Sequence, residues 1–148
     1  MDNIDRKILN ILQKEFPLIE RPFLEVAQKC GLNEEEVISR VQKLKEQGII
    51  RRIGAIFDGA KLGRTSTLCG VKVPDEELEG FIKVLNSNAG VTHSYRRNNE
   101  YNVWFTLNAE SEVDIEYILA QLRAETGNED ILSMKAVRTF KINATFEL

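Results

Sequence analysis

An imidazole and a phenol occur in this sequence at the spacing of a β-strand. His93 and Tyr95 are two residues apart, and Val91 precedes them by the same interval. Alternate residues of a strand point to one face, so we expect these three side chains to share a face and the two rings to be neighbours. An imidazole can release a proton near neutral pH or bind a metal ion, although a lone strand histidine is more often structural. His93 and Tyr95 are therefore candidate catalytic residues.

Four arginines could bind an acidic ligand near this pair. Arg96 and Arg97 follow Tyr95 directly, and Arg51 and Arg52 are adjacent earlier in the chain. A planar guanidinium group binds a carboxylate through two parallel hydrogen bonds, which makes Arg the preferred residue for such ligands. The alternative for Arg51 and Arg52 is a solvated position or a phosphate contact, and for Arg96 and Arg97 it is the charged end of a hairpin. Both interpretations stay open.

A second predicted strand adds aromatic side chains. Alternation divides its residues between two faces. One face is apolar and most simply packs into the core of a sheet: Tyr101, Val103, Phe105 and Leu107. Trp104 is on the opposite face with Asn102 and Thr106, where its indole could stack on a flat ligand or form a subunit contact. Tyr101 and Trp104 are thus candidate ligand-binding residues.

The first part of the chain predicts a helical framework. Hydrophobic spacing, caps and breakers predict three helices, over about residues 3–15, 22–30 and 34–47. Asn33 caps the third helix, whose first turn is acidic and suits the helix dipole. The β-rich segment 49–57 follows directly and is predicted to form a wing. Residues 1–60 are therefore predicted to form a winged helix-turn-helix domain.

The second part predicts a domain of mixed helices and strands. The turn-rich segment Asp58–Gly63 marks the border between the two domains. After it we expect, in order, a strand at about 65–73, a helix at 74–85, strands at 90–96 and 101–107, a helix at 111–125 and a strand at 132–142. The order βαββαβ is the ferredoxin-like arrangement. The fold class is α+β, with a ferredoxin-like domain over residues 61–148.

The overall composition indicates which broad classes of protein this chain can belong to. The chain has 43% hydrophobic and 29% charged residues, as in a globular protein, and its apolar runs are too short to span a bilayer, so no membrane role is expected. Residues 1–5 lack the basic flank and apolar stretch of a signal peptide, so a cytoplasmic location is expected. Cys30 and Cys69 form no zinc-binding pattern, and we expect two reduced, mostly buried thiols.

The charge distribution weakens a nucleic-acid hypothesis. Residues 1–60 contain 10 Lys and Arg and 10 Asp and Glu, so the predicted helix-turn-helix domain is neutral within a chain of net charge -3. Sequence-independent DNA binding depends on clustered Lys and Arg that neutralise phosphates. A recognition helix reads DNA from its N-terminal turn, which here contains Glu34, Glu35 and Glu36. Three carboxylates would repel phosphates, so DNA binding is not expected.

The order of the predicted elements resembles the Lrp/AsnC family over the whole chain. Asn3, Asp5 and Ile8-Leu9 echo the Asp-x-x-Asp-x-x-Ile-Leu theme with which members of that family open. A narrower resemblance is to the siroheme decarboxylases. The segments that carry it are Arg21-Pro22-Phe23, Gly48 to Ala55, Leu62-Gly63, Ser66-Thr67-Leu68, Gly90 to Tyr95, Tyr101 to Leu107 and Phe140-Lys141-Ile142.

The narrower resemblance implies a substrate and a reaction. Members of this family remove the carboxyl groups of two acetate side chains of siroheme, an iron tetrapyrrole, to give 12,18-didecarboxysiroheme on a route to haem. For this chain, it implies that His93, Tyr95 and Arg97 are catalytic, with His93 as a proton donor or as an axial ligand of the substrate iron. No cofactor and no metal held by the protein alone are implied. The residues implied to bind siroheme are Arg51, Arg52, Arg96, Tyr101 and Trp104.

One position departs from the family pattern and implies a partner. Members commonly follow a His-Asn-Tyr segment with a second histidine. Here the segment reads His93-Ser94-Tyr95, and Asn99 stands where the second histidine is expected. The chain therefore resembles the A-type subunit of a heterodimeric decarboxylase, which implies that a homologous B-type subunit completes the active site.

Other functions stay open at this point. The Lrp/AsnC resemblance also fits a transcription regulator whose third helix enters the major groove. A regulator that senses a tetrapyrrole, or a chain that only completes its partner's pocket, would keep the ligand site without the reaction. Release of CO2 from siroheme would indicate the enzyme, whereas salt-dependent binding to a specific DNA sequence would indicate the regulator.

Overall fold

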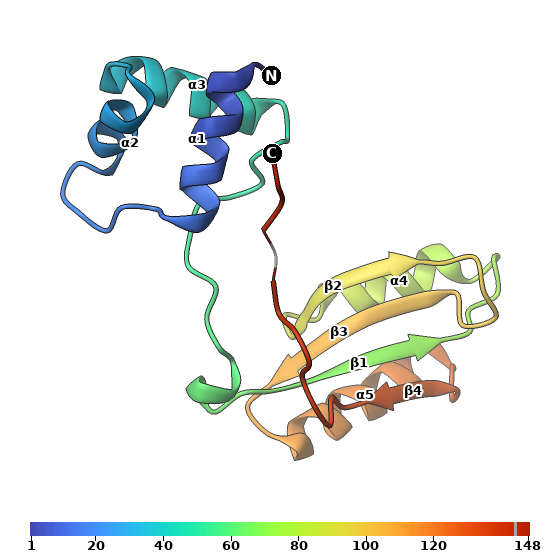
Figure 1. Ribbon diagram of the computed structural model, residues 1–148. Helices are drawn as coiled ribbons and strands as arrows, with labels where there is room; N and C mark the ends of the chain where they lie inside the picture. Colours follow the sequence, from blue (N-terminus) through green and yellow to red (C-terminus); the bar gives the residue numbers. More distant parts are fainter. Residues whose placement is uncertain (144) are drawn as a thin grey trace. The chain divides into compact units, whose positions relative to one another are not determined.

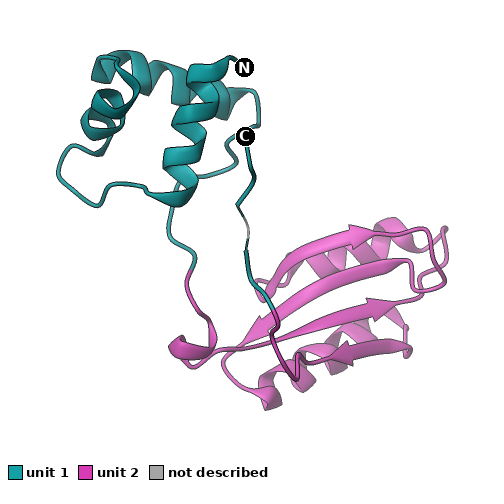
Figure 2. Ribbon diagram, in the orientation of Figure 1, with its two compact units in different colours: residues 1–56, 141–148 teal, residues 57–140 magenta. Residues whose placement is uncertain are grey.

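The chain forms two compact units. The computed structural model describes residues 1–143 and 145–148. A helical unit contains residues 1–56 and 141–148, and a sheet unit contains residues 57–140 (Figure 2). These units differ from the predicted domains, 1–60 and 61–148, in the position of the border and in the assignment of the C-terminal segment.

The C-terminal segment belongs to the helical unit because it bonds to the first helix. The side-chain amide of Gln13 donates to the carbonyl of Phe146 at 2.6 Å and accepts from the Phe146 N–H at 2.9 Å. Asn10 Nδ2 donates to the carbonyl of Leu148 at 3.0 Å. Pairing of this kind joins residues far apart in sequence, which local patterns cannot predict.

The helical unit contains the three predicted helices. They are α1 (Asn3–Lys14), α2 (Pro22–Cys30) and α3 (Glu34–Glu46). Asp2 and Asp5 form a reciprocal capping box at the start of α1, and Asn33 accepts the N–H of Glu36 at the start of α3. Arg40 of α3 bonds to Asp2 and Asp5, both at 2.8 Å, so ionic contacts join α1 to α3. The buried core consists of Ile8, Leu9, Val26, Ala27, Val37, Val41, Leu44 and Ile50.

The predicted wing at residues 49–57 is wrong. The N–H groups of Ile49 and Ile50 both donate to the carbonyl of Leu44, at 3.0 and 3.1 Å, and close the end of α3. Residues 51–57 are extended but have no backbone partner within the part of the chain that the structure describes. A strand needs a neighbour to accept and donate its backbone hydrogen bonds. The N-terminal fold is therefore a helix-turn-helix without a wing.

The sheet unit has the predicted ferredoxin-like order. A short 3-10 helix, η1 (Ala60–Leu62), precedes an antiparallel sheet with strand order β2-β3-β1-β4. Helices α4 and α5 cover the same face of this sheet (Figure 1). Predicted strand 132–142 is wrong beyond residue 134, because its ladder with β1 ends there. The elements are β1 (Thr65–Val71), α4 (Leu78–Ser87), β2 (Val91–Arg96), β3 (Val103–Ala109), α5 (Glu112–Thr126) and β4 (Ile131–Met134).

The two faces of the sheet differ as the alternation of β3 predicts. Val103, Phe105 and Leu107 are buried in the core beneath the helices. Trp104 and Thr106 point to the other face, which the helices leave uncovered and which we call the open face. The prediction for these five residues is confirmed. Tyr101 lies before the start of β3 and is not part of its core row.

A β-bulge in β2 decides which face carries the histidine. Val91 pairs with Leu107, whereas His93 pairs with Thr106, so one extra residue of β2 is accommodated between them. Val91 therefore packs against the core, and His93 and Tyr95 are shifted to the open face. The expectation that all three share a face is wrong for Val91, because a bulge reverses the alternation.

Candidate functional site

His93 and Tyr95 form a ring pair on the open face. Their ring centroids are 6.4 Å apart and their planes differ by 20°, so the predicted proximity is confirmed. Tyr95 is 53% exposed, and His93 is exposed as well. The pair is thus accessible to a ligand lying on the sheet.

Two polar residues hold the imidazole. Thr92, the residue at the bulge, places its hydroxyl oxygen 3.0 Å from His93 Nδ1. Asn108 Nδ2 donates to the same hydroxyl oxygen at 3.1 Å, which favours donation of the hydroxyl hydrogen to Nδ1. That arrangement describes the neutral imidazole; in the imidazolium form Nδ1–H would donate to the Thr92 oxygen instead, and Nε2–H would be the group that can pass a proton to a ligand.

Trp104 provides a flat apolar surface beside this pair. Tyr95 pairs with Trp104 across the β2–β3 ladder, and the indole lies over Gly70 of β1. A Cβ at position 70 would be 3.3 Å from three atoms of the indole ring, so glycine permits this close packing. The indole N–H donates to the carbonyl of Tyr101 at 2.7 Å, which fixes the ring orientation. The open face therefore combines a fixed indole with the His93–Tyr95 pair.

Apolar side chains extend the open face across the other two strands. Leu68 of β1 pairs with Met134 of β4, and Gly70 pairs with Leu132. Leu68, Leu132 and Met134 are 44%, 38% and 39% exposed, respectively. This surface suits an apolar, planar ligand or another protein surface.

The predicted arginine sites do not all join this group. Arg96 pairs with Val103 in the ladder and therefore points to the helix side of the sheet, where it bonds to Asp75 at 2.8 Å. Arg97 follows the end of β2, and its N–H donates to the carbonyl of Asn102 at 2.7 Å. Arg51 and Arg52 belong to the helical unit, where both are exposed. Within the sheet unit, the structure brings together His93, Tyr95 and Trp104 but not Arg96.

Tyr101 is held in an ionic cluster at the end of the β2–β3 hairpin. Its hydroxyl donates to Asp130 at 3.2 Å, and Lys72 Nζ lies 4.6 Å from its ring centroid. Lys72 also pairs with Glu100 at 2.5 Å and with Asp130 at 3.4 Å. The bond to Glu100 is the main reason that the pKa of Lys72 is raised to about 12. These contacts give Tyr101 an evident structural role.

Three contributors to the site were missed in the sequence: Thr92, Asn108 and Gly70. A glycine inside a strand signals a bulge or a close approach, so Gly70 could have been noticed. Thr92 and Asn108 carry no such signal, because their contact with His93 depends on the bulge and on the β2–β3 register.

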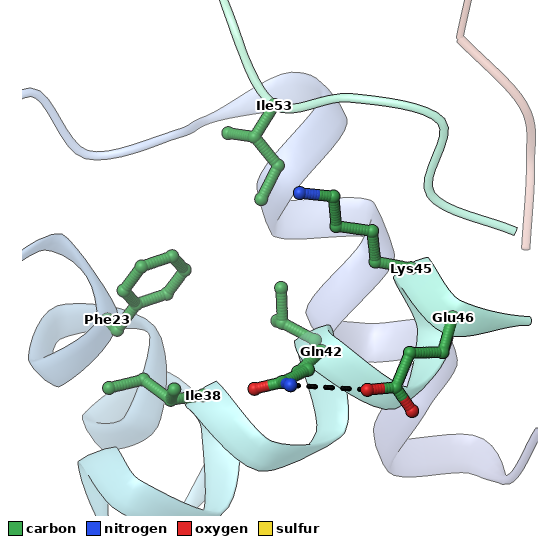
Figure 3. A pocket seen from close by; sticks show the side chains of 7 residues that line it. Phe23, Ile38, Gln42, Lys45, Glu46 and Ile53 are labelled. Atoms are coloured by element: carbon green, nitrogen blue, oxygen red, sulfur yellow. Dashed lines mark hydrogen bonds between the residues drawn. The ribbon is translucent and has the colours of Figure 1, made fainter. Parts of the chain in front are cut away.

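The first turn of α3 carries carboxylates that form ion pairs. Glu34 pairs with Arg21 and Glu36 pairs with Arg40, so two carboxylates of the acidic first turn are bound within the helical unit. Farther along α3 lies a shallow hollow with mixed polar and apolar walls (Figure 3). The residues that line it are Phe23, Ile38, Val41, Gln42, Lys45, Glu46 and Ile53. Gln42 donates to Glu46 at 3.2 Å across its rim.

Two absences hold for the part of the chain that the structure describes. Residues 1–143 and 145–148 contain no group of three or more His, Cys, Asp and Glu side chains arranged to bind a metal ion. Over the same residues, no helix is long and apolar enough to cross a membrane.

Comparisons with known proteins identify the family. Residues 5–51 match the model of the siroheme decarboxylase NirDL-like HTH domain, and residues 61–141 match the AsnC-like ligand binding domain. The siroheme decarboxylase alpha subunit of Desulfovibrio desulfuricans is 45% identical over 100% of this chain and 85% of its own length. The chain belongs to the siroheme decarboxylase family.

Two solved structures place this family within the wider fold. The siroheme decarboxylase NirDL in co-complex with an iron-uroporphyrin III analogue has a TM-score of 0.71 at 34% identity, covering 94% of this chain but only 47% of that chain. An AsnC family transcriptional regulator from Agrobacterium tumefaciens has a TM-score of 0.80 at 26% identity, covering 99% and 96%. The family thus shares the Lrp/AsnC fold, and one member has chains about twice as long as this one.

Proposed function

We propose that this chain is the alpha-type subunit of a siroheme decarboxylase, which removes CO2 from two acetate side chains of siroheme. The observation that carries the proposal is the 45% identity, over the whole chain, to a protein named siroheme decarboxylase alpha subunit. The open face supports it, because a proton donor beside a fixed indole suits a large aromatic substrate.

The reaction sets three chemical requirements. The bond between the carboxylate carbon and the methylene carbon breaks, CO2 leaves, and the electron pair stays on the methylene carbon. A proton then converts the methylene group to a methyl group. The macrocycle can delocalise the negative charge, so the protein has to orient the carboxylate, exclude water and deliver the proton. The proposed reaction therefore needs no cofactor besides the substrate itself.

The described residues suggest roles for this chain. As an imidazolium, His93 would donate its Nδ1–H to the Thr92 hydroxyl oxygen and deliver the proton from Nε2, which leaves a neutral imidazole. Tyr95 would position the imidazole by stacking, and Trp104 would support the macrocycle. Arg97 would bind a substrate carboxylate at the end of β2. Arg96 is a weaker candidate, since Asp75 already binds its guanidinium group.

We further propose that a second, homologous subunit completes the active site. Asn99 stands where family members commonly have a second histidine, so this chain alone lacks that group. Relatives from Pseudomonas aeruginosa and Stutzerimonas stutzeri are likewise named as subunits of siroheme decarboxylase. The partner would supply the missing histidine and further cationic groups for the eight carboxylates of siroheme.

A transcription regulator is the second candidate, favoured by the structural similarity to the Agrobacterium protein. Against it stand the neutral charge of residues 1–60 and the acidic first turn of α3. A regulator would show sequence-specific DNA binding that weakens steeply with salt.

The decisive experiment compares the chain alone with the chain co-expressed with its second subunit. Each preparation is incubated anaerobically with siroheme, and both CO2 and the tetrapyrrole product are measured. We expect two CO2 per siroheme from the complex and little from the chain alone. Absence of product from an intact complex that binds siroheme would exclude the decarboxylase.

A further inference from the structure

The bulge in β2 brings a threonine hydroxyl to the imidazole. The extra residue between the paired positions Val91 and His93 is Thr92. In a regular strand, neighbouring side chains point to opposite faces, which keeps them apart. Here the hydroxyl oxygen of Thr92 lies 3.0 Å from Nδ1 of His93. The irregularity of the strand thus gives Nδ1 a polar partner and leaves Nε2 as the nitrogen that can meet a ligand.

A second residue holds this hydroxyl group. Asn108 follows Trp104 and Thr106 on the open face of β3, and its side-chain amide donates to the hydroxyl oxygen of Thr92 at 3.1 Å. Thr92 is exposed, whereas Asn108 is half-buried. A hydroxyl oxygen can accept two hydrogen bonds and donate one. The amide therefore occupies one acceptor position, and one acceptor position and one hydrogen of the hydroxyl group remain for the imidazole.

Backbone contacts place Asn108 beside the bulge. Its N–H donates to the carbonyl of Gly90 at 2.9 Å, and the N–H of Gly90 donates to the side-chain oxygen of Asn88 at 2.9 Å. A Cβ at position 90 would lie 2.7 Å from the carbonyl oxygen of Asn108, so this close approach requires glycine. The meeting of Asn108 with Thr92 is therefore fixed by the main chain at the start of β2.

A hydroxyl group can hold the imidazole in both of its protonation states. Toward an imidazolium, the oxygen of Thr92 accepts a hydrogen bond from Nδ1–H. Toward a neutral imidazole whose Nδ1 is unprotonated, the same hydroxyl donates. A carboxylate in this place could only accept, and its negative charge would oppose loss of the imidazolium proton. A neutral partner of both kinds keeps the ring of His93 in one orientation while its charge changes.

We propose that Thr92 and Asn108 are positioning residues for proton delivery by His93. This inference rests on the proposed function, in which His93 protonates the substrate. In each decarboxylation the Nε2–H bond breaks, its electron pair stays on Nε2, and the proton goes to the methylene carbon. Nδ1–H stays bonded to Thr92, and a proton from solvent then restores the imidazolium. Because His93 would act twice on each siroheme, its orientation has to survive the change of charge.

NMR measures the hydrogen bond directly, because His93 is the only histidine in the sequence. Nitrogen spectra of the full chain with isotope-labelled histidine report on this ring alone. Thr92→Val removes the hydroxyl group and keeps the branched shape that suits a strand, whereas Thr92→Ser keeps the hydroxyl group. We expect the Nδ1 resonance to shift in Thr92→Val and to stay close to its original position in Thr92→Ser.

The matched control for the NMR measurement is Thr65→Val. Thr65 belongs to β1 and pairs with Ala109, which is part of the core on the helix side of the sheet. Loss of its hydroxyl group should leave the imidazole resonances unchanged. An unshifted Nδ1 resonance in Thr92→Val would overturn the inference. An equal shift in Thr65→Val would also overturn it, because the shift would then not report the contact with Thr92.

The two-subunit complex tests the role in the reaction. Release of CO2 is measured over a range of siroheme concentrations. Thr92→Val should lower kcat about tenfold or more and change KM less than about twofold, because the proton donor is misplaced while the binding surface is kept. Thr92→Ser should restore most of the rate, and Asn108→Ala should cause a smaller loss than Thr92→Val.

The outcomes separate this inference from the proposed function. Full activity of Thr92→Val, or a Thr92→Ser complex as slow as Thr92→Val, would overturn the positioning role. Release of no CO2 by the complex of unsubstituted subunits would instead contradict the proposed function. The NMR comparison would then still decide whether the hydroxyl group of Thr92 holds the imidazole.

Discussion

The outer face of α3 and the open face of the sheet are the two surfaces on which related folds could bind a ligand, and they carry different side chains. On α3, two carboxylates of the acidic first turn pair with Arg21 and Arg40, and Lys43 and Lys45 lie in the last turn. On the sheet, an imidazole, a phenol and an indole lie together with exposed apolar groups. The sheet therefore carries the groups suited to the proposed chemistry, whereas the first turn of α3 carries carboxylates held in ion pairs.

The sharpest test of this difference is His93→Ala in the two-subunit complex. Loss of a proton donor typically costs about 10²- to 10⁴-fold in rate, so CO2 release should fall by a factor in that range. The control is Ser94→Ala, since Ser94 pairs with Phe105, points to the helix side and bonds to Asn86. Similar rates for the two variants would show that the open face is not the reaction site.

The two cysteines provide a comparison of the units themselves. Cys69 in β1 is fully buried, and burial is the main reason that its pKa rises to about 12, whereas Cys30 in α2 is half-buried. The raised pKa lowers the thiolate fraction of Cys69 at pH 8, so Cys69 should resist alkylation while Cys30 is labelled. Mass spectrometry of each peptide measures this. Fast labelling of Cys69 in the folded protein would contradict the described core.

The same pKa shift predicts a loss of stability in alkali. A raised pKa means that the folded state holds the thiol proton more tightly than the unfolded state. The contribution of Cys69 is fully present below about pH 9 and is lost as the pH rises toward 12. We therefore expect the unfolding midpoint of the Cys69→Ala variant to decrease less steeply with pH over this range than the midpoint of the unsubstituted chain.

Removal of the indole should have a smaller effect, on substrate affinity. Trp104→Leu keeps an apolar side chain but loses aromatic stacking, which contributes about 0.5–1.5 kcal/mol, or about a 2- to 13-fold change in Kd. An absorbance titration of the complex with iron-uroporphyrin measures it. Tyr117→Leu is the control, since Tyr117 is an exposed aromatic residue of α5. Unchanged affinity in Trp104→Leu would remove the indole from the substrate site.

The smallest effect concerns the cap of the helical unit. The pKa of Asp2 lies below its usual value because the carboxylate accepts the N–H of Asp5 and also pairs with Arg40. The stability that this contributes is present above about pH 4 and is lost as the pH falls, because the unfolded state then binds the proton first. Asp2→Asn, which keeps a capping side chain, should show a weaker decrease in melting temperature between pH 6 and pH 3. An identical decrease would contradict the role of the charged pair.

Much of the fold could be predicted because its signals are local. The helices at 3–14, 22–30 and 34–46 follow from caps, breakers and apolar spacing, and the order βαββαβ follows from short alternating segments. The proximity of His93 and Tyr95 follows from strand spacing and was predicted as well. These features depend on the backbone geometry of a few consecutive residues.

The pairing of distant segments was decided by tertiary structure alone. Segments 49–57 and 135–142 have the composition of strands yet form none, because no described neighbour supplies the backbone partners that a strand requires. The bulge between Val91 and His93 turns the imidazole to the open face, and Thr92 and Asn108 then hold it. Residue identity determines which groups are available for chemistry, whereas the register between strands determines which of them meet.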